Sequence, residues 1–331
     1  MNAVGQGEVA ILEGTVPPTS PARPGPSACG PAGRWFSRGG HLGLALRAAT
    51  LITRGIPTPI RYRLADIGGT AAYWMLRDRA AVARGNYQVF APGDPAATAR
   101  LTSSAFRNYA RTLLDFLVLE RLVERLKATP ETVDMAPLQR ELDQGRAAVV
   151  VTPHLGNWDL GAAMIATCGR PVHAVADKFG PPAVDSLIRA VRERLGVRII
   201  PTGPSSAREA LRALRRGEVL LLAADIDRAG TGVAVSFLGR RVYLPAGPAT
   251  LALRTGASLI PGYVRRLPGG RHEARMLDPI PFPAAGDAES RVRQLTQGIA
   301  EAFEKMIWMD PGQWFAFHRL VSADRTPEEG R

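Results

Sequence analysis

A histidine and an aspartate five positions apart, His154 and Asp159, are the residues whose types best suit proton-transfer chemistry. They stand in the stretch from Ala147 to Ala166, which reads AAVVVTPHLGNWDLGAAMIA. A neutral imidazole can take a proton near neutral pH, and a carboxylate bonded to one ring nitrogen fixes the tautomer and raises the basicity of the other. The pair therefore suggests a general base that activates a hydroxyl nucleophile.

The spacing of this pair restricts where the two side chains can lie. On one continuous helix, five positions separate side chains by about 140°, so the two cannot share a helix face. The apolar run 147–151 predicts a buried strand, and the run 160–166 predicts the start of a buried helix. His154 would then lie in the turn, with a residue of the Gly156-Asn157 pair as N-cap. The alternative is a loop histidine bonded to a backbone carbonyl, with Asp159 favouring the helix N-terminus.

A second candidate site follows another predicted strand. The run 218–224, EVLLLAA, is typical of a buried strand, and Asp225 and Asp227 come directly after it. The carboxyl ends of parallel strands are where catalytic groups collect in α/β folds. These carboxylates could steady His154, contact substrate hydroxyls or form a turn.

A third candidate is cationic. The helix predicted at 182–195 carries Arg189, Arg192 and Arg194. Arginines that reach inward could clamp a phosphate with two hydrogen bonds, although most arginines on a helix face solvent.

Several common site types are missing from the sequence. There is no G-x-S-x-G motif, no dinucleotide fingerprint and no phosphate loop with Lys-Ser/Thr. The five histidines are far apart in the chain, and Cys29 and Cys168 stand in unlike settings. We therefore expect no metal site and no disulfide framework.

The elements that must position these residues alternate in the second half of the chain. Strand patterns at 147–151, 172–176, 197–201, 218–224, 233–237 and 258–265 are interleaved with helical patterns at 182–195, 205–216, 246–255 and 288–307. Upstream, helices are expected at 41–54, 60–85, 96–127 and 137–145. Such alternation predicts an α/β fold with a mostly parallel central sheet flanked by helices, preceded by an N-terminal amphipathic helical region.

The domain organisation follows from composition. We expect a disordered, proline-rich tail at 1–40, a helical membrane-docking region at 41–145, an α/β core at 146–320 and a flexible tail at 321–331.

The charge is concentrated near the N-terminus. The net charge is +12, and between Arg34 and Arg84 nine arginines stand against two acids. Tryptophans, tyrosines and apolar runs are interleaved with these arginines, which favours an anionic membrane surface over nucleic acid as the partner. The alternative is a helical subdomain with a solvated basic face. No run approaches the roughly 20 apolar residues that span a bilayer. We therefore expect peripheral binding on the cytosolic face of the membrane.

The sequence also resembles a known family. The segment VVTPHLGNWD, with four residues between His154 and Asp159, resembles the signature of the lysophospholipid acyltransferase superfamily. The blocks 181–201, 221–261, 104–116 and 313–320 are similar to those of its lipid A late acyltransferase and phosphatidylinositol mannoside acyltransferase branch, over roughly 42–320. Aspartate at position 159 is more typical of the mannoside acyltransferases.

This resemblance implies an enzyme that moves a fatty acyl chain from acyl-CoA or acyl carrier protein to a hydroxyl of a membrane glycolipid or phospholipid. His154 would be the general base and Asp159 would orient it, without a cofactor. Binding of substrate would fall to the residues that match the downstream blocks: Arg192, Arg194, Asp225, Asp227 and Arg228. The alternatives are an acyl thioesterase and a non-catalytic protein that binds anionic membranes.

Overall fold

A computed structural model describes residues 50, 52–228 and 230–320, which belong to one compact unit. The tails predicted at 1–40 and 321–331, and most of the helix predicted at 41–54, lie outside the described residues. The boundary near residue 145 stays a prediction.

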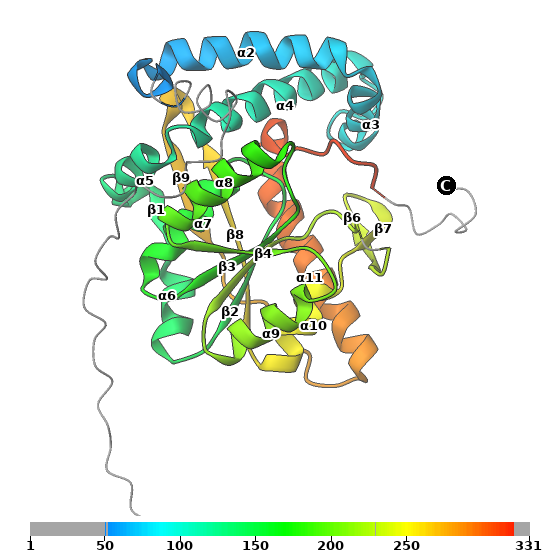
Figure 1. The fold of residues 1–331 in the computed structure, drawn as a ribbon. Helices are drawn as coiled ribbons and strands as arrows, with labels where there is room; N and C mark the ends of the chain where they lie inside the picture. Colours follow the sequence, from blue (N-terminus) through cyan, green and yellow to red (C-terminus); the bar gives the residue numbers. More distant parts are fainter. Residues whose placement is uncertain (1–49, 51, 229, 321–331) are drawn as a thin grey trace, which may run out of the picture. The chain divides into compact units, whose positions relative to one another are not determined.

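A seven-stranded sheet forms the centre of the described part of the chain, in the order β1-β9-β8-β2-β5-β3-β4 (Figure 1). All neighbouring strands are parallel except β8 and β9. The strands of this sheet are β1 (Val133–Asp134), β2 (Ala148–Thr152), β3 (Val172–Ala176), β4 (Val197–Pro201), β5 (Val219–Ala223), β8 (Ser258–Arg266) and β9 (His272–Met276). β6 (Val233–Phe237) and β7 (Arg240–Leu244) form a separate antiparallel hairpin. The predicted α/β fold with a mostly parallel sheet is confirmed.

Helices cover both faces of the sheet. They are α2 (Thr58–Met75), α3 (Arg77–Tyr87), α4 (Pro95–Phe116), α5 (Leu119–Lys127), α6 (Ala136–Asp143), α7 (Trp158–Ile165), α8 (Pro182–Arg194), α9 (Ser206–Arg215), α10 (Gly247–Thr255) and α11 (Ala288–Met309). Side chains of β2 alternate between the two faces of the sheet, and all five residues are buried, as is typical of a strand covered by helices on both sides. Val149 and Val151 join the core under α9, α10 and α11, whereas Ala148 and Val150 join the core under α6 and α7.

The N-terminal helices differ from the prediction in where they break. The pattern at 60–85 forms two helices, α2 and α3, which meet at Leu76. The pattern at 96–127 also divides, because α4 ends at Phe116 and α5 turns its apolar face into a core shared with α7. Gly69 marks a close crossing of α2 over α4, since a Cβ there would lie 2.6 Å from the Cα of Arg107. α2 therefore lies directly on α4 (Figure 1).

None of the helices in the described ranges is both long enough and apolar enough to cross a bilayer.

Candidate active site

His154 lies where the sequence predicts, between the end of β2 and the start of α7. Asn157 is the N-cap of α7, because its Oδ1 accepts a 3.0 Å hydrogen bond from the backbone N–H of Leu160. Gly156 adopts a positive φ of 63°, and a Cβ at this position would overlap the carbonyl oxygen of Val264. The turn therefore requires glycine there, both for its conformation and for the close approach of β8.

Asp225 is the carboxylate that holds the His154 imidazole. Its Oδ1 lies 2.6 Å from His154 Nδ1, and its Oδ2 accepts a 3.0 Å bond from the His154 backbone N–H. The register of the sheet explains this pairing: Thr152 of β2 is opposite Ala223 of β5, so His154 and Asp225 each lie two residues beyond the same paired position. Steadying His154 is one of the roles that the sequence left open for Asp225.

The pair is electrostatically suited to accept a proton. Burial opposes charge on the His154 imidazole, but the charge and hydrogen bond of Asp225 raise the pKa of His154 above its ordinary value. Burial likewise opposes the charge of Asp225, yet contacts with His154 and the Trp314 indole lower the pKa of this carboxyl. About 25% of the His154 side chain is exposed, and within the described residues no hydrogen bond to its Nε2 is present. The second ring nitrogen is therefore free to face a substrate.

The expectation that Asp159 orients His154 is wrong in this structure. Asp159 lies in the first turn of α7, as predicted, but its Oδ1 accepts a 2.7 Å hydrogen bond from Nε of Arg192 on α8. The Asp159 carboxylate thus points from the first turn of α7 toward α8, whereas the His154 imidazole is hydrogen-bonded to Asp225, two residues after the end of β5. The two acid side chains therefore have separate partners.

Of the other predicted binding residues, Arg228 acts on His154, whereas Asp227 and Arg194 contact other parts of the protein. Arg228 lies 3.5 Å from His318 Nε2 and 3.6 Å from Asp177, and its charge acts to lower the pKa of His154. Asp227 braces its own loop by accepting a 2.8 Å bond from the Gly232 N–H. Arg194 is half-exposed and lies 3.5 Å from Glu120 of α5. Of these three residues, Arg228 is the one whose charge acts on the His154 imidazole.

The C-terminal aromatic segment supplies contacts that reasoning from the sequence missed. The fully buried Trp314 donates a 2.9 Å hydrogen bond from Nε1 to Asp225 Oδ2, and the Phe315 N–H donates a 2.7 Å bond to the His154 carbonyl. Trp158 packs edge-on against His154, with ring centroids 5.5 Å apart. The cluster of aromatic residues in the segment 313–320 was the available signal, but it did not reveal which ring would reach the aspartate.

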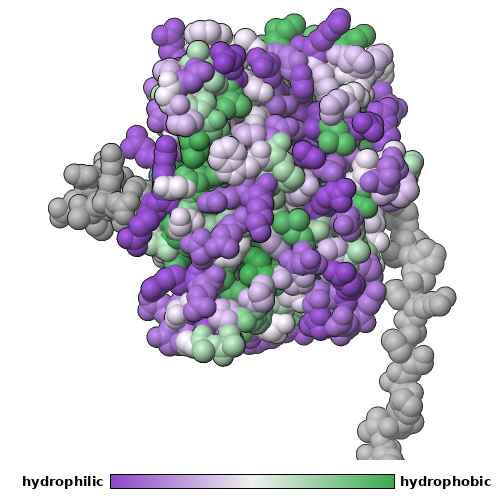
Figure 2. Space-filling model, turned by 180° about the vertical axis from the view of Figure 1, so that it is seen from behind, coloured by the Kyte–Doolittle hydropathy of each residue, from purple (hydrophilic) through white to green (hydrophobic). Residues whose placement is uncertain are grey.

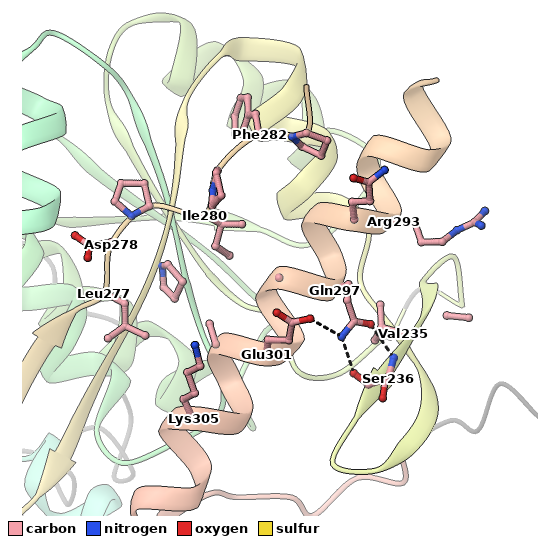
Figure 3. A pocket seen from close by; sticks show the side chains of 18 of the residues that line it. Val235, Ser236, Leu277, Asp278, Ile280, Phe282, Arg293, Gln297, Glu301 and Lys305 are labelled. Atoms are coloured by element: carbon pink, nitrogen blue, oxygen red, sulfur yellow. Dashed lines mark hydrogen bonds between the residues drawn. The ribbon is translucent and has the colours of Figure 1, made fainter. Parts of the chain in front are cut away.

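A groove of about 1100 Å³ lies elsewhere, between α11, the β6–β7 hairpin and the proline-rich segment 277–283. Figure 3 shows Gln297 at its side, bonded to both Glu301 and Ser236. Neither His154 nor Asp225 lines this groove, so it does not form part of the His154–Asp225 centre.

The His154–Asp225 pair offers a metal ion one imidazole and one carboxylate as ligands. Within the described residues, no group of three or more His, Cys, Asp or Glu side chains is arranged to hold a metal ion.

Comparison with known proteins shows the family to which the chain belongs. Residues 41–322 match the model of the family described as bacterial lipid A biosynthesis acyltransferase. The chain belongs to the bacterial lipid A biosynthesis acyltransferase family. The predicted resemblance to this branch is thereby confirmed, and the match spans both the N-terminal helices and the sheet.

Individual relatives of this acyltransferase-family chain are similar over part of their length. It is 30% identical over 207 residues to a phosphatidylinositol mannoside acyltransferase from Mycolicibacterium smegmatis, covering 62% of this chain and 66% of that protein. It is 31% identical over 190 residues to a phosphatidylinositol mannoside acyltransferase from Mycobacterium tuberculosis, covering 56% of this chain and 58% of that protein. The chain thus spans less than two thirds of the length of each of these relatives.

One solved structure is also similar to this member of the family. The crystal structure of a 1-acyl-sn-glycerophosphate (LPA) acyltransferase from Thermotoga maritima matches with a TM-score of 0.34 and 15% identity, covering 75% of this chain and 97% of that one.

Proposed function

We propose that the protein is an O-acyltransferase that moves a fatty acyl chain from a thioester to a hydroxyl of a membrane lipid. The observation that carries this proposal is the 2.6 Å contact between Asp225 and His154 at the carboxyl end of the parallel sheet. A histidine whose Nδ1 is held by a buried carboxylate and whose Nε2 is free is suited to general base catalysis. The family match supports acyl transfer as the reaction.

The proposed reaction needs no covalent enzyme intermediate. His154 Nε2 takes the proton of the acceptor hydroxyl, and the acceptor oxygen bonds to the thioester carbonyl carbon. The C–S bond then breaks, and the leaving thiolate receives the proton from the imidazolium. Asp225 stabilises the imidazolium while it exists and holds the ring with Nε2 toward the acceptor.

The proposed acceptor is a glycolipid of the phosphatidylinositol mannoside type, with a lipid A precursor or a phospholipid as the alternative acceptors of the same reaction. Support for the mannoside type comes from the names of the relatives that are 30% and 31% identical. The donor is a thioester of coenzyme A or of acyl carrier protein. Arg192, oriented by Asp159, and Arg228 beside His318 are the proposed contacts for anionic groups of these substrates.

We further propose that α2 docks on an anionic membrane at its cytosolic face, where thioester donors of this kind are found. Its outer face carries large apolar side chains at helical spacing, each at least 52% exposed: Ile60, Leu64, Ile67, Trp74 and Met75. α2 runs along the top of the molecule in Figure 1, and the view from behind shows hydrophobic residues among the polar ones at this top edge (Figure 2). Arg63 and Arg77 are exposed beside them, whereas Arg61, Tyr62 and Tyr73 from the predicted basic and aromatic set are buried. An apolar stripe flanked by arginines suits the interface of an anionic bilayer.

Acyl transfer with purified protein tests this function. Labelled acyl-CoA or acyl carrier protein thioester is incubated with vesicles that contain a panel of phosphatidylinositol mannosides, lipid A precursors and phospholipids. The expected result is an acylated lipid whose formation depends on one acceptor class. Free fatty acid formed without acceptor dependence would identify a thioesterase, and vesicle binding without any product would identify a non-catalytic membrane binder. Either result would overturn the proposal. Lipid mass spectrometry of cells that lack the protein would then name the natural acceptor.

A further inference from the structure

The turn that carries His154 is fixed by hydrogen bonds on both sides of the residue. Three of these bonds join backbone groups: Phe315 N–H to His154 O at 2.7 Å, Gly156 N–H to Gln313 O at 2.9 Å, and Asn157 N–H to Val264 O at 2.8 Å. A fourth bond comes from a side chain, since Thr112 Oγ1 of α4 lies 3.0 Å from Gly156 O. This fourth bond can be removed by a substitution that leaves every backbone group in place.

The direction of the Thr112 hydroxyl is set by Arg266 at the end of β8. Arg266 Nη2 lies 3.1 Å from Thr112 Oγ1. A guanidinium can only donate, so the threonine oxygen accepts there and its single proton remains for the Gly156 carbonyl. Thr112 is 4% exposed, so the bond is shielded from solvent. The arginine thus orients the hydroxyl toward the turn.

Arg266 is itself held by a buried ionic network. Its Nη2 donates to Asp115 Oδ2 at 2.8 Å and its Nε to Tyr62 Oη at 3.1 Å, while Arg61 and the Tyr62 hydroxyl also donate to Asp115. Burial opposes the charge of Asp115, but the His272 imidazole, whose Nε2 lies 3.5 Å from Oδ2, and the charge of Arg266 bring the pKa of this carboxyl to about 2. The carboxylate therefore stays ionised at neutral pH. The network joins α2, α4 and β8 to the turn beside His154.

We propose that Thr112 is a positioning residue of the active site and that Arg266 acts through it, by aiming the Thr112 hydroxyl at the Gly156 carbonyl and so fixing the turn that places His154. The inference rests on the acyl transfer proposed above, in which a base displaced by a fraction of an ångström loses catalytic efficiency. If the network served only to hold α4 against β8, its disruption would make the protein less stable. The catalytic rate would then not depend on the Thr112 hydroxyl in particular.

The test compares Thr112→Val, which keeps the shape of the side chain and removes its hydroxyl, with Thr112→Ser, which keeps the hydroxyl. Thr102→Val is the matched control, because Thr102 is buried in the same helix and, within the described part of the chain, its hydroxyl donates to the Thr98 carbonyl of its own helix. For Thr112→Val we expect kcat to fall about tenfold or more, with KM for both substrates within about twofold of the parent. Thr112→Ser is expected to recover kcat to within about threefold, and Thr102→Val to keep it. Equal kcat in the Val and Ser variants, or a change confined to KM, would overturn the proposal.

A second measurement does not depend on activity. Amide hydrogen exchange, followed by mass spectrometry of peptides that cover 154–158, reports on the Gly156 and Asn157 N–H bonds. We expect exchange about tenfold faster in Thr112→Val than in Thr112→Ser, with peptides of β3 and β4 unchanged. If the parent protein transfers no acyl chain, the proposed function fails while this measurement still decides the role of Thr112. Unchanged exchange at 154–158, or a uniform increase across the protein, would overturn the positioning role.

Discussion

Nε of Arg192 donates a 2.7 Å hydrogen bond to Oδ1 of Asp159, so the acid that follows His154 in the chain is bonded to an arginine of the next helix. Both side chains are largely buried, at 18% and 11% exposure. The acid bonded to the imidazole is Asp225, which follows β5. The two carboxylates should therefore affect the pH dependence of the rate differently, which the comparison of Asp225→Asn with Asp159→Asn below tests.

Replacement of His154 by alanine is expected to remove acyl transfer, because it removes the proposed base. General bases contribute about 10²- to 10⁴-fold to rate, so we expect a loss of that size in kcat, with the overall fold and vesicle binding retained. His173→Gln is a control, since His173 pairs with Glu218 near the start of β3, away from the carboxyl end of the sheet. Full activity in His154→Ala would rule out the proposed base.

The pH dependence of kcat/KM should identify the partner of His154. Because Asp225 raises the pKa of His154, the rate of the parent enzyme should fall with decreasing pH at values above the ordinary histidine pKa of about 6.5. Asp225→Asn removes the charge that raises this pKa, so its acid limb should move to lower pH and its maximal rate should fall about 10²-fold. Asp159→Asn should leave the acid limb in place. A shift in Asp159→Asn and none in Asp225→Asn would contradict the assignment.

Arg192 is expected to act on substrate binding. Arg192→Lys keeps the charge but loses the planar fork that can bond Asp159 and an anionic group together, so we expect KM for one substrate to rise about tenfold with little change in kcat. Arg189→Lys on the same helix is the matched control, because Arg189 bonds Asp185 four residues earlier. Steady-state kinetics against donor and acceptor separately would show which substrate Arg192 contacts. An unchanged KM for both would exclude that role.

The outer face of α2 should govern membrane binding. The double variant Leu64→Glu with Ile67→Glu puts charges at two of its exposed apolar positions and should reduce binding to anionic vesicles about tenfold or more. The reason is that each apolar side chain no longer buried in the membrane costs on the order of 2 kcal/mol of binding free energy. Phe282→Glu, at an exposed phenylalanine of the 277–283 segment, should bind as the parent does. Cosedimentation with phosphatidylglycerol and phosphatidylcholine vesicles measures both variants. Equal binding of the double variant and the parent would exclude α2 as the docking surface.

Asp115 is expected to be the most important single charge for stability among the ion pairs discussed. Asp115→Asn leaves Arg61 and Arg266 buried without their carboxylate, which typically costs about 3–5 kcal/mol of unfolding free energy. Asp66→Asn should cost under about 1 kcal/mol, because the Asp66–Arg111 pair is partly exposed. Urea unfolding measures both. A loss in Asp115→Asn no larger than that in Asp66→Asn would contradict the prediction.

The same carboxyl sets an acid limit to stability. The pKa of Asp115 is about 2 in the folded protein and ordinarily about 3.9 in an unfolded chain. Its contribution is therefore fully present above about pH 4 and is lost as the pH falls toward 2. Urea unfolding at pH 4 and at pH 2 should therefore show a larger loss of unfolding free energy in the parent than in Asp115→Asn, and an equal loss in both would contradict this role of Asp115.

Much of the fold could be predicted from the sequence, because strands and helix starts are indicated by patterns of neighbouring residues. The strands β3, β4 and β6 have the bounds that their short apolar runs predict, and the helix that follows His154 begins after the predicted cap Asn157. The breaks after Met75 and Phe116 were not predicted, since the helical periodicity continues across both. The strands β1, β7 and β9 were also not predicted. β1 has two residues, Arg240 and Arg241 begin β7, and alternating charges interrupt β9, so none of the three presents a clear apolar run.

The sequence by itself determined that His154 and Asp225 each follow a buried strand, because the pattern of apolar residues and turn residues around each is local. Only the tertiary structure decided that the two meet. β2 pairs with β5, although β3 and β4 lie between them in the chain, and the register sets Thr152 opposite Ala223. Strand order depends on contacts between distant segments, which no local pattern records. For the same reason the nearer aspartate, Asp159, was assigned to His154, while α8 placed Arg192 beside it.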